Sequence, residues 1–285
     1  MSNFVVRCLR SIPPGTPGKT RLAHFLMERG LAQCDGKVED RFGFHYKVPD
    51  TREPIAFHLT IDGVYELDTL SVILDELAPG GTFIDIGANV GVFTLPAARR
   101  VGENGRVLAA EASPDILPYL FHNLAQNEAR AVTVINSAIC DTTGSVPFYR
   151  APSEKFGMGS LGAQFNGESI DIPARTLDDV LKEHRISGVN VLKVDVEGFE
   201  LAVFRGARNL LADRRPPLIL FEFCDWAEAR MPIAQPGDAQ QFLMDHGYSI
   251  CRLVDFRRSR QPFRQPMRTG ATMLAAWRSD SPATA

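Results

Sequence analysis

The stretch Gly81-Thr-Phe-Ile-Asp-Ile-Gly-Ala-Asn-Val-Gly-Val-Phe-Thr94 decides the fold. Its β-branched and aromatic run, 82–86, follows two glycines and predicts a short buried strand with Asp85 near the carboxyl end. Gly87 and Gly91 then allow a tight turn and a close approach of the backbone to a ligand. A strand, a glycine turn and a helix amino terminus together form a nucleotide-type site, because oriented N–H groups face the crevice.

The spacing of these glycines distinguishes between nucleotide ligands. A dinucleotide fingerprint needs G-x-G-x-x-G, in which the second glycine lets a pyrophosphate come close. Here the pattern is D-x-G-x-x-x-G, with Ala88 and Asn89 after Gly87, and a helix is predicted from Val90 onward. The pattern favours a ligand with a cationic amino-acid end and a nucleoside end, such as S-adenosylmethionine. The alternative is an ordinary strand–turn–helix without a ligand.

Composition and charge exclude several classes of protein. With 285 residues, of which 45% are hydrophobic and 23% charged, the chain can bury a full core and has an ordinary globular composition. A formal net charge of −3 argues against a nucleic-acid partner, because phosphate contacts need a basic surface. The chain has no apolar run near the roughly 20 residues of a membrane helix, and its first residues lack the apolar region of a signal peptide.

Cysteine usage points to a reducing compartment. The five cysteines are scattered, odd in number and without C-x-x-C spacing; they are Cys8, Cys34, Cys140, Cys224 and Cys251. Such a set predicts neither a disulfide framework nor a zinc site. We therefore expect a cytoplasmic protein without a membrane span.

Beyond the central stretch, strand and helix patterns alternate, which predicts a parallel sheet in one α/β domain over residues 64–285. The further predicted elements are strands at 106–111, 132–135, 191–197 and 218–222, helices at 68–77, 113–127, 176–183, 198–211 and 239–246, and a terminal antiparallel pair of strands at 248–254 and 272–277. Residues 1–63 are expected to form an N-terminal extension. Within it, 42–48 and 55–61 have strand character and predict a β-hairpin.

Glu111 ends the second predicted strand, some 24 positions beyond Gly87. In doubly wound sheets an acid at about this spacing accepts hydrogen bonds from both ribose hydroxyls. Asp85 and Glu111 would lie at the carboxyl ends of adjacent strands, where open α/β sheets bind their ligands. The alternative is that Glu111 faces solvent at a strand end.

The second strong signal is Lys193-Val-Asp-Val-Glu-Gly198. In a strand, the period of two places Lys193, Asp195 and Glu197 on one face. Three ionisable groups on one face of a central strand are costly unless they pair with one another, a ligand or a metal. The alternative is a buried lysine–carboxylate network that holds the loops.

Taken together, these motifs resemble the FkbM family of S-adenosylmethionine-dependent methyltransferases. The resemblance covers about residues 64–223 and rests on Tyr65-Glu66, Phe83 to Thr94, Glu111-Ala-Ser-Pro114, Asn123 to Asn127, Ala138-Ile-Cys-Asp141, Arg175 to Asp178, Leu192 to Glu200, Gly206-Ala207 and Glu222. It implies a class I Rossmann-like α/β fold, a mostly parallel seven-stranded sheet with helices on both faces and S-adenosyl-L-methionine as cofactor. It also implies methyl transfer to a hydroxyl of a sugar, polyketide or similar small metabolite, without fixing the acceptor.

The resemblance also implies which residues hold the cofactor. They share positions around the crevice and comprise Gly87, Ala88, Asn89 and Gly91 at the methionine end with Asp85 behind them, Glu111 and Ala112 at the ribose, Ala138 and Asp141 at the adenine, and Glu66, which with Tyr65 would close over the cofactor. The segment Gly157-Met-Gly-Ser-Leu-Gly162 is either a lid over the acceptor or a disordered loop.

The chemistry requires alignment of acceptor, methyl and sulfur, and removal of the acceptor's proton. An alcohol is a poor nucleophile at neutral pH, so a base or a metal would assist it. Asp195 or Glu197 is the candidate for either task, with Lys193 as the charge partner. A bound Mg²⁺ ion remains an alternative, because two carboxylates can begin such a site. A catalytically inactive cofactor-binding module that acts through partners is the alternative. The missing middle glycine disfavours a nicotinamide-dependent oxidoreductase.

Overall fold

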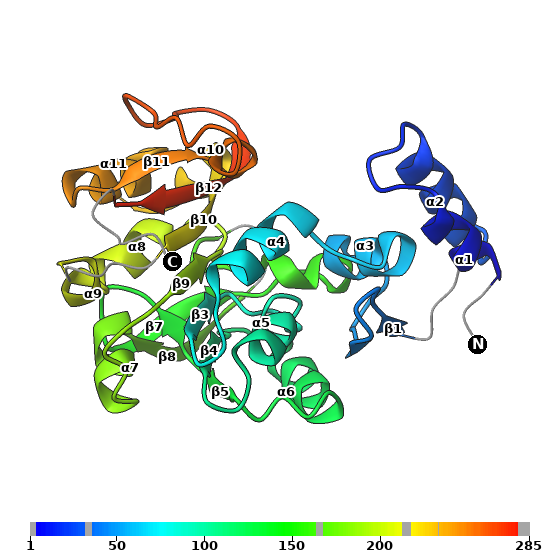
Figure 1. Cartoon of the computed structure of the whole chain (residues 1–285), viewed down its shortest axis with the longest axis horizontal. Helices are drawn as coiled ribbons and strands as arrows, with labels where there is room; N and C mark the ends of the chain where they lie inside the picture. The colour runs from blue at the N-terminus through cyan, green and yellow to red at the C-terminus, as the bar shows by residue number, and fades with distance from the viewer. Residues whose placement is uncertain (1–3, 32–35, 164–167, 213–217, 233, 279–285) are drawn as a thin grey trace.

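The computed structural model describes residues 4–31, 36–163, 168–212, 218–232 and 234–278; Cys34 lies outside these ranges. A seven-stranded sheet forms the centre of the molecule (Figure 1). In spatial order its strands are β11 (Ser249–Arg252), β12 (Ala271–Trp277), β10 (Leu218–Cys224), β9 (Val191–Val194), β3 (Thr82–Ile86), β4 (Arg106–Ala110) and β5 (Val132–Ile135). β12 pairs antiparallel with both of its neighbours, and the other pairs are parallel. The expected mostly parallel Rossmann-like sheet with its antiparallel terminal pair is confirmed.

The sheet has a hydrophobic core on each face. Successive side chains of a strand point to opposite faces, and in β3 Phe83 joins one core while its neighbours Ile84 and Ile86 join the other. The first core packs against α4 (Leu67–Glu76), α5 (Thr94–Val101), α6 (Leu117–Gln126) and α12 (Leu253–Phe256). The second packs against α7 (Leu177–Glu183), α8 (Glu200–Arg205), α9 (Arg208–Ala212) and α11 (Asp238–Asp245). No helix in the described ranges has the length and apolar character needed to cross a membrane.

Three helix boundaries differ from the predictions. α5 begins at Thr94 rather than Val90, because the turn after β3 stays bonded to β4, with the Gly87 and Ala88 N–H groups both donating to Ala110 O at 3.0 Å. α6 begins at Leu117, four residues later than predicted. The helix predicted over 198–211 is split into α8 and α9 at Gly206, where a β-carbon would lie 2.0 Å from Cys140 O.

A smaller three-stranded sheet lies beside the carboxyl ends of the main strands. Its order is β6 (Ala138–Ile139), β8 (Ser169–Arg175) and β7 (Gly144–Tyr149). A 3₁₀ helix, η1 (Ser153–Met158), follows β7, and α10 (Asp225–Glu228) follows β10. Both segments reach the edge of the sheet where the strands end, so they contribute to the pocket described below.

The predicted hairpin of the extension is wrong in its second strand. Residues 55–61 are helical and belong to α3 (Pro54–Asp62), while β2 (His45–Lys47) pairs with β1 (Lys37–Glu39). The helix is capped by Glu53 at its start and by Gly63, in a left-handed conformation, at its end. Its residues are buried on most sides, so the 3.6-residue polar period that marks an amphipathic helix is missing from the sequence.

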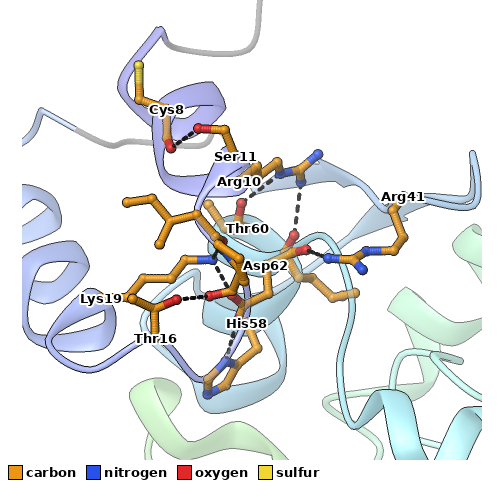
Figure 2. Close-up of polar contacts among 12 residues, drawn as sticks. Cys8, Arg10, Ser11, Thr16, Lys19, Arg41, His58, Thr60 and Asp62 are labelled. Atoms are coloured by element: carbon orange, nitrogen blue, oxygen red, sulfur yellow. Dashed lines mark hydrogen bonds and ion pairs between the residues drawn. The ribbon is translucent and has the colours of Figure 1, made fainter.

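Within the extension, α1 and α2 hold the carboxyl end of α3 through a polar cluster (Figure 2). α1 (Phe4–Ser11) contributes Arg10, which donates to Leu59 O and Thr60 O, each at 2.9 Å. At the start of α2 (Lys19–Glu28), Lys19 Nζ donates to Asp62 Oδ1 at 2.5 Å, and the other Asp62 oxygen lies 2.8 Å from His58 Nδ1. Because cations neutralise the helix end and Lys19 and Asp62 are both buried, α3 is fixed in place.

Candidate active site

A cavity of about 260 Å³ opens at the carboxyl ends of β3, β4, β9 and β10. Three walls surround it. The sheet and its turns form the first wall, the start of α3 and the Tyr65-Glu66 segment form the second, and residues 157–161 form the third. This is the edge at which parallel α/β sheets bind ligands, so the fold itself places the predicted motifs around one cavity.

The turn after β3 depends on glycine. Gly87 has φ 79°, and a β-carbon there would lie 1.8 Å from Asp195 O. Only glycine allows this approach, which brings the β3 turn and the β9 turn together. Asn89 is also left-handed, with φ 51°, and its side-chain Oδ1 accepts from the Val90 N–H at 2.8 Å.

Glu111 is fixed at the end of β4 by backbone donors. Its Oε2 accepts from the Asn89 N–H and its Oε1 from the Ser113 N–H, both at 2.8 Å. Burial raises the pKa of the Glu111 carboxyl, while these hydrogen bonds act in the opposite direction. The side chain lines the cavity and is only 8% exposed. It can therefore accept hydrogen bonds from a ligand while it braces the turn.

Lys193 lies under the cavity floor, almost completely buried. Its Nζ donates to Gly87 O at 2.9 Å and lies 3.3 Å from Asp195 Oδ2 and 3.5 Å from Asp85 Oδ1. Burial alone would lower the pKa of this ammonium, but the charges of Asp195, Asp85 and Glu66 outweigh burial and raise it. Lys193 is therefore a fixed cation shared between acids rather than a proton acceptor.

Asp85 is buried behind Lys193 and does not line the cavity. Its Oδ2 accepts from the Thr94 hydroxyl at 2.6 Å, while its Oδ1 has no hydrogen bond in the described structure. Burial raises the pKa of the Asp85 carboxyl, and the charge of Lys193 opposes this. Asp85 thus supports Lys193 and the first turn of α5, from one layer below the cavity.

The prediction that Lys193, Asp195 and Glu197 share one strand face is wrong for Glu197. β9 ends at Val194, and Asp195 only extends the ladder by one hydrogen bond, to Ile86 O at 3.0 Å. Glu197 is left-handed, with φ 56°, in a turn held by Glu200, whose Oε1 accepts from the N–H groups of residues 196 and 198. The turn, rather than strand alternation, brings Glu197 to the cavity.

Asp195, Glu197 and Glu222 form an acid triad whose carboxylate oxygens lie within 4.8 Å of one another. All three are half-buried and line the cavity. Burial, followed by the charges of Asp195 and Glu197, raises the pKa of Glu222 to about 9. Such a set can bind a divalent cation or share and accept protons.

The cavity gathers most of the predicted site residues. Those that line it are Glu66, Gly87, Ala88, Asn89, Glu111, Ala112, Ala138, Lys193, Asp195 and Glu197. Three do not line it: Asp85 lies behind Lys193, Gly91 packs near the Leu120 side chain, and Asp141 is exposed. Asp141 fails to reach the cavity because the chain leaves it after Ile139.

The lining residues that the sequence did not predict as site residues include Glu53, Phe148, Phe199 and Trp226, and also Glu222 of the acid triad. Glu53 carries a signal that could have found it, since an acid directly before a proline is typical of a helix start. The three aromatic residues carry no such signal, because their side chains meet only through the tertiary structure.

The segment 157–161 is packed against the cavity as a cover. A β-carbon on Gly159 would lie 2.5 Å from the Phe148 ring, so glycine permits close contact with β7. Ser160 exchanges backbone hydrogen bonds with Tyr149 at 2.8 and 3.1 Å, and its hydroxyl donates to Glu197 O at 3.1 Å. Of the two sequence interpretations, the structure favours a lid.

Family comparison agrees with this arrangement. The model of the methyltransferase FkbM domain matches residues 85–250, more than half of the chain. The chain belongs to the FkbM methyltransferase family. The matched range of this FkbM-family chain begins inside β3 and includes both the Glu111 and the Lys193 segments.

Three relatives of the FkbM-family chain have named activities. Methyltransferase sdnD of Sordaria araneosa is 30% identical over 159 residues, 45% of this chain and 61% of that protein. Hexuronic acid methyltransferase AglP of Haloferax volcanii is 27% identical over 149 residues, 51% of this chain and 58% of that protein. The 31-O-demethyl-FK506 methyltransferase FkbM of Streptomyces tacrolimicus is 26% identical over 211 residues, 61% of this chain and 75% of that protein. The chain thus spans less than two thirds of the first two relatives.

Proposed function

We propose that the protein is an S-adenosylmethionine-dependent O-methyltransferase that acts on a hydroxyl of a small metabolite, such as a sugar or a polyketide. The observation that carries the proposal is the cavity at the strand ends, where the glycine turn, Glu111 and the acid triad meet. Membership of the FkbM family supports methyl transfer. The names of two relatives, one acting on a hexuronic acid and one on a demethylated FK506, support a hydroxylated acceptor.

The cofactor would lie along the sheet wall. Glu111 would accept hydrogen bonds from the ribose hydroxyls, because its carboxyl lines the cavity at the end of β4. The turn at Gly87 would allow the methionine end to approach the backbone closely. When bound, S-adenosylmethionine supplies an activated methyl group on a sulfonium, so the protein has to orient the acceptor and remove its proton.

The acid triad is the proposed site of proton removal. Asp195 is the best candidate for the base, because Lys193 lies 3.3 Å from its Oδ2 and fixes its position. Glu222, with a pKa of about 9, would stay protonated at neutral pH and so would not accept the proton. A Mg²⁺ ion would fit the same three carboxylates and would lower the pKa of the acceptor hydroxyl instead.

Calorimetry with S-adenosylhomocysteine and with NAD tests the cofactor. We expect S-adenosylhomocysteine to bind and NAD not to bind. Absence of S-adenosylhomocysteine binding would remove the proposal, and binding without any methyl transfer would favour an inactive binding module.

A panel of neutral sugars, uronic acids and macrolide alcohols, incubated with S-adenosylmethionine carrying a labelled methyl group, tests the acceptor. Mass spectrometry of the product would show whether oxygen carries the methyl group. The same reactions with EDTA, and with Mg²⁺ restored, separate the metal from the base mechanism. Loss of turnover in EDTA and recovery with Mg²⁺ would assign the triad to the ion.

A further inference from the structure

One wall of the cavity comes from outside the range that defines the family. The family model begins at residue 85, whereas Glu53, Pro54 and Ile55 of the extension line the cavity. Among these three, Glu53 carries the ionisable group. The extension therefore contributes chemistry to the site as well as surface.

Glu53 has two oxygens with different roles. It is the N-cap of α3, where Oε2 accepts from the Ala56 N–H at 3.1 Å. Its other oxygen, Oε1, points toward the lid, since a β-carbon on Gly157 would lie 2.8 Å from it. The same β-carbon would lie 2.8 Å from Asn89 Nδ2. One acceptor and one donor thus converge beneath the lid, from two different walls.

The orientation of the Asn89 amide is fixed by its own hydrogen bond. Asn89 Oδ1 accepts from the Val90 N–H at 2.8 Å, so Nδ2 is the atom left to face the cavity. Glu53 is 3% exposed, and no ion pair to it occurs among the described residues. The neighbouring cation, Arg52, is exposed and paired with Asp50. Glu53 is a buried acid without a cation, which burial makes costly.

α3 holds Glu53 rigidly. The opposite end of this helix is fixed by Arg10, Lys19 and Arg41, as Figure 2 shows. Ala56 and Leu59 of the same helix are buried in the first core of the sheet. A side chain on such an element is held with the precision that ligand recognition needs. Burial raises the pKa of Glu53 to about 7, which agrees with a carboxyl that lacks a cation.

We propose that Glu53 and Asn89 bind the zwitterionic amino-acid end of S-adenosylmethionine. Glu53 Oε1 accepts a hydrogen bond from the ammonium group, and Asn89 Nδ2 donates one to the carboxylate. The ammonium and the carboxylate of an α-amino acid engage both groups with charge-assisted hydrogen bonds, and the ammonium supplies the cation that the buried Glu53 lacks, whereas a hydroxyl supplies no charge. The inference rests on the proposed function and extends the cofactor site into the segment that precedes the family domain.

The test compares two ligands in the full chain by calorimetry. S-adenosylhomocysteine has the amino-acid end, and 5′-methylthioadenosine lacks it while keeping the adenosine. In Glu53→Gln the neutral amide keeps the volume and an oxygen that can cap α3. We expect S-adenosylhomocysteine to bind about tenfold more weakly, as for the loss of one charge-assisted hydrogen bond, and 5′-methylthioadenosine to bind within twofold of the wild type.

The matched control is Glu103→Gln, which makes the same charge change at an exposed position before β4, at the opposite end of the sheet. It should leave both affinities unchanged. Equal weakening of the two ligands in Glu53→Gln would mean that Glu53 only shapes the cavity, and unchanged binding of both would mean that it is only a helix cap. Either result overturns the inference. Failure of the wild-type protein to bind S-adenosylhomocysteine would instead show that the proposed function itself fails.

Discussion

Two buried lysines, one in the extension and one under the cavity, are paired in different ways. Lys19 lies 2.5 Å from Asp62 Oδ1 and 2.6 Å from Ile12 O. Lys193 reaches its two carboxylates only at 3.3 and 3.5 Å, and it donates its hydrogen bond to a backbone carbonyl. We call the Lys19 cluster closed, because its polar contacts are short and buried, and the Lys193 cluster open, because Lys193 is shared between two acids and one of them lines the cavity.

The difference separates a structural ion pair, Lys19–Asp62, from an ion pair at the candidate active site, Lys193–Asp195. In the Lys19 cluster both Asp62 oxygens have partners, and the pair holds α3 against α2. In the Lys193 cluster Asp85 Oδ1 lacks a hydrogen bond, and Asp195 faces the cavity. Burying a charge is costly unless it is paired, and Asp85 supports Lys193 from below the cavity. Asp195 is the acid of this cluster that a ligand or a reaction can reach, because it lines the cavity.

The largest expected effect lies in the open cluster. Asp195→Asn should lower turnover by roughly 10²–10⁴-fold, the usual contribution of a positioned proton acceptor, because the amide cannot accept the proton. The melting temperature and the affinity for S-adenosylhomocysteine should change little, since Lys193 keeps its ion pair with Asp85 and its hydrogen bond to Gly87 O. Single-turnover rates and thermal unfolding of the same preparation measure both. A drop in stability with full turnover per folded molecule would assign Asp195 to structure.

The closed cluster should show the reverse pattern. Asp62→Asn leaves Lys19 buried without a carboxylate, so the free energy of unfolding should fall by about 3–5 kcal/mol. Denaturant unfolding measures the loss, and Lys19→Met together with Asp62→Asn should recover part of it. Turnover per folded molecule should stay near the wild-type value at a temperature where both proteins are folded. An unchanged free energy of unfolding would show that the Lys19–Asp62 pair does not stabilise the fold.

Glu111 lines the cavity, and each of its carboxyl oxygens already accepts one backbone hydrogen bond. Glu111→Ala should weaken S-adenosylhomocysteine binding by about 1–3 kcal/mol, as expected for lost charge-assisted hydrogen bonds to the ribose. Ser113→Ala keeps the backbone donor to Glu111, so it serves as a neighbouring control in the same titration. If the dissociation constant does not change in Glu111→Ala, the residue only braces the turn.

Glu222 should make the stability of the protein depend on pH. Its pKa is about 9 in the folded protein and 4.5 ordinarily, so between these pH values the folded state keeps a proton that the unfolded chain has lost. This contribution to stability is complete below pH 4.5 and is lost as the pH rises through about 9. Glu222→Gln should flatten the decline, by less than about 1.4 kcal/mol per pH unit. Parallel curves for the two proteins, measured by denaturant unfolding from pH 5 to 9, would contradict the raised pKa of Glu222.

Local sequence was sufficient wherever one signal dominated. The strand at 82–86 and the helix predicted at 176–183, observed as α7, follow the predictions, because β-branched runs and capping residues act over a few positions. The cap of α7 is the Thr176 hydroxyl, which accepts from the Asp179 N–H. The order of motifs was sufficient to predict the sheet and the cofactor edge, because parallel strands end on the same side.

Long-range contacts decided the rest. Residues 55–61 fold as part of α3. Their sequence resembles a strand because the helix is buried on most sides and therefore lacks the polar residues that mark a helical period. Glu197 reaches the cavity through a left-handed turn held by Glu200, and Glu53 reaches it because α3 packs into the first core beside the strand ends. The sequence by itself thus determined the elements, the sheet and the chemistry of its edge. Only the tertiary structure decided which distant acids share the cavity, because residues far apart in the chain become neighbours through packing that no local pattern encodes.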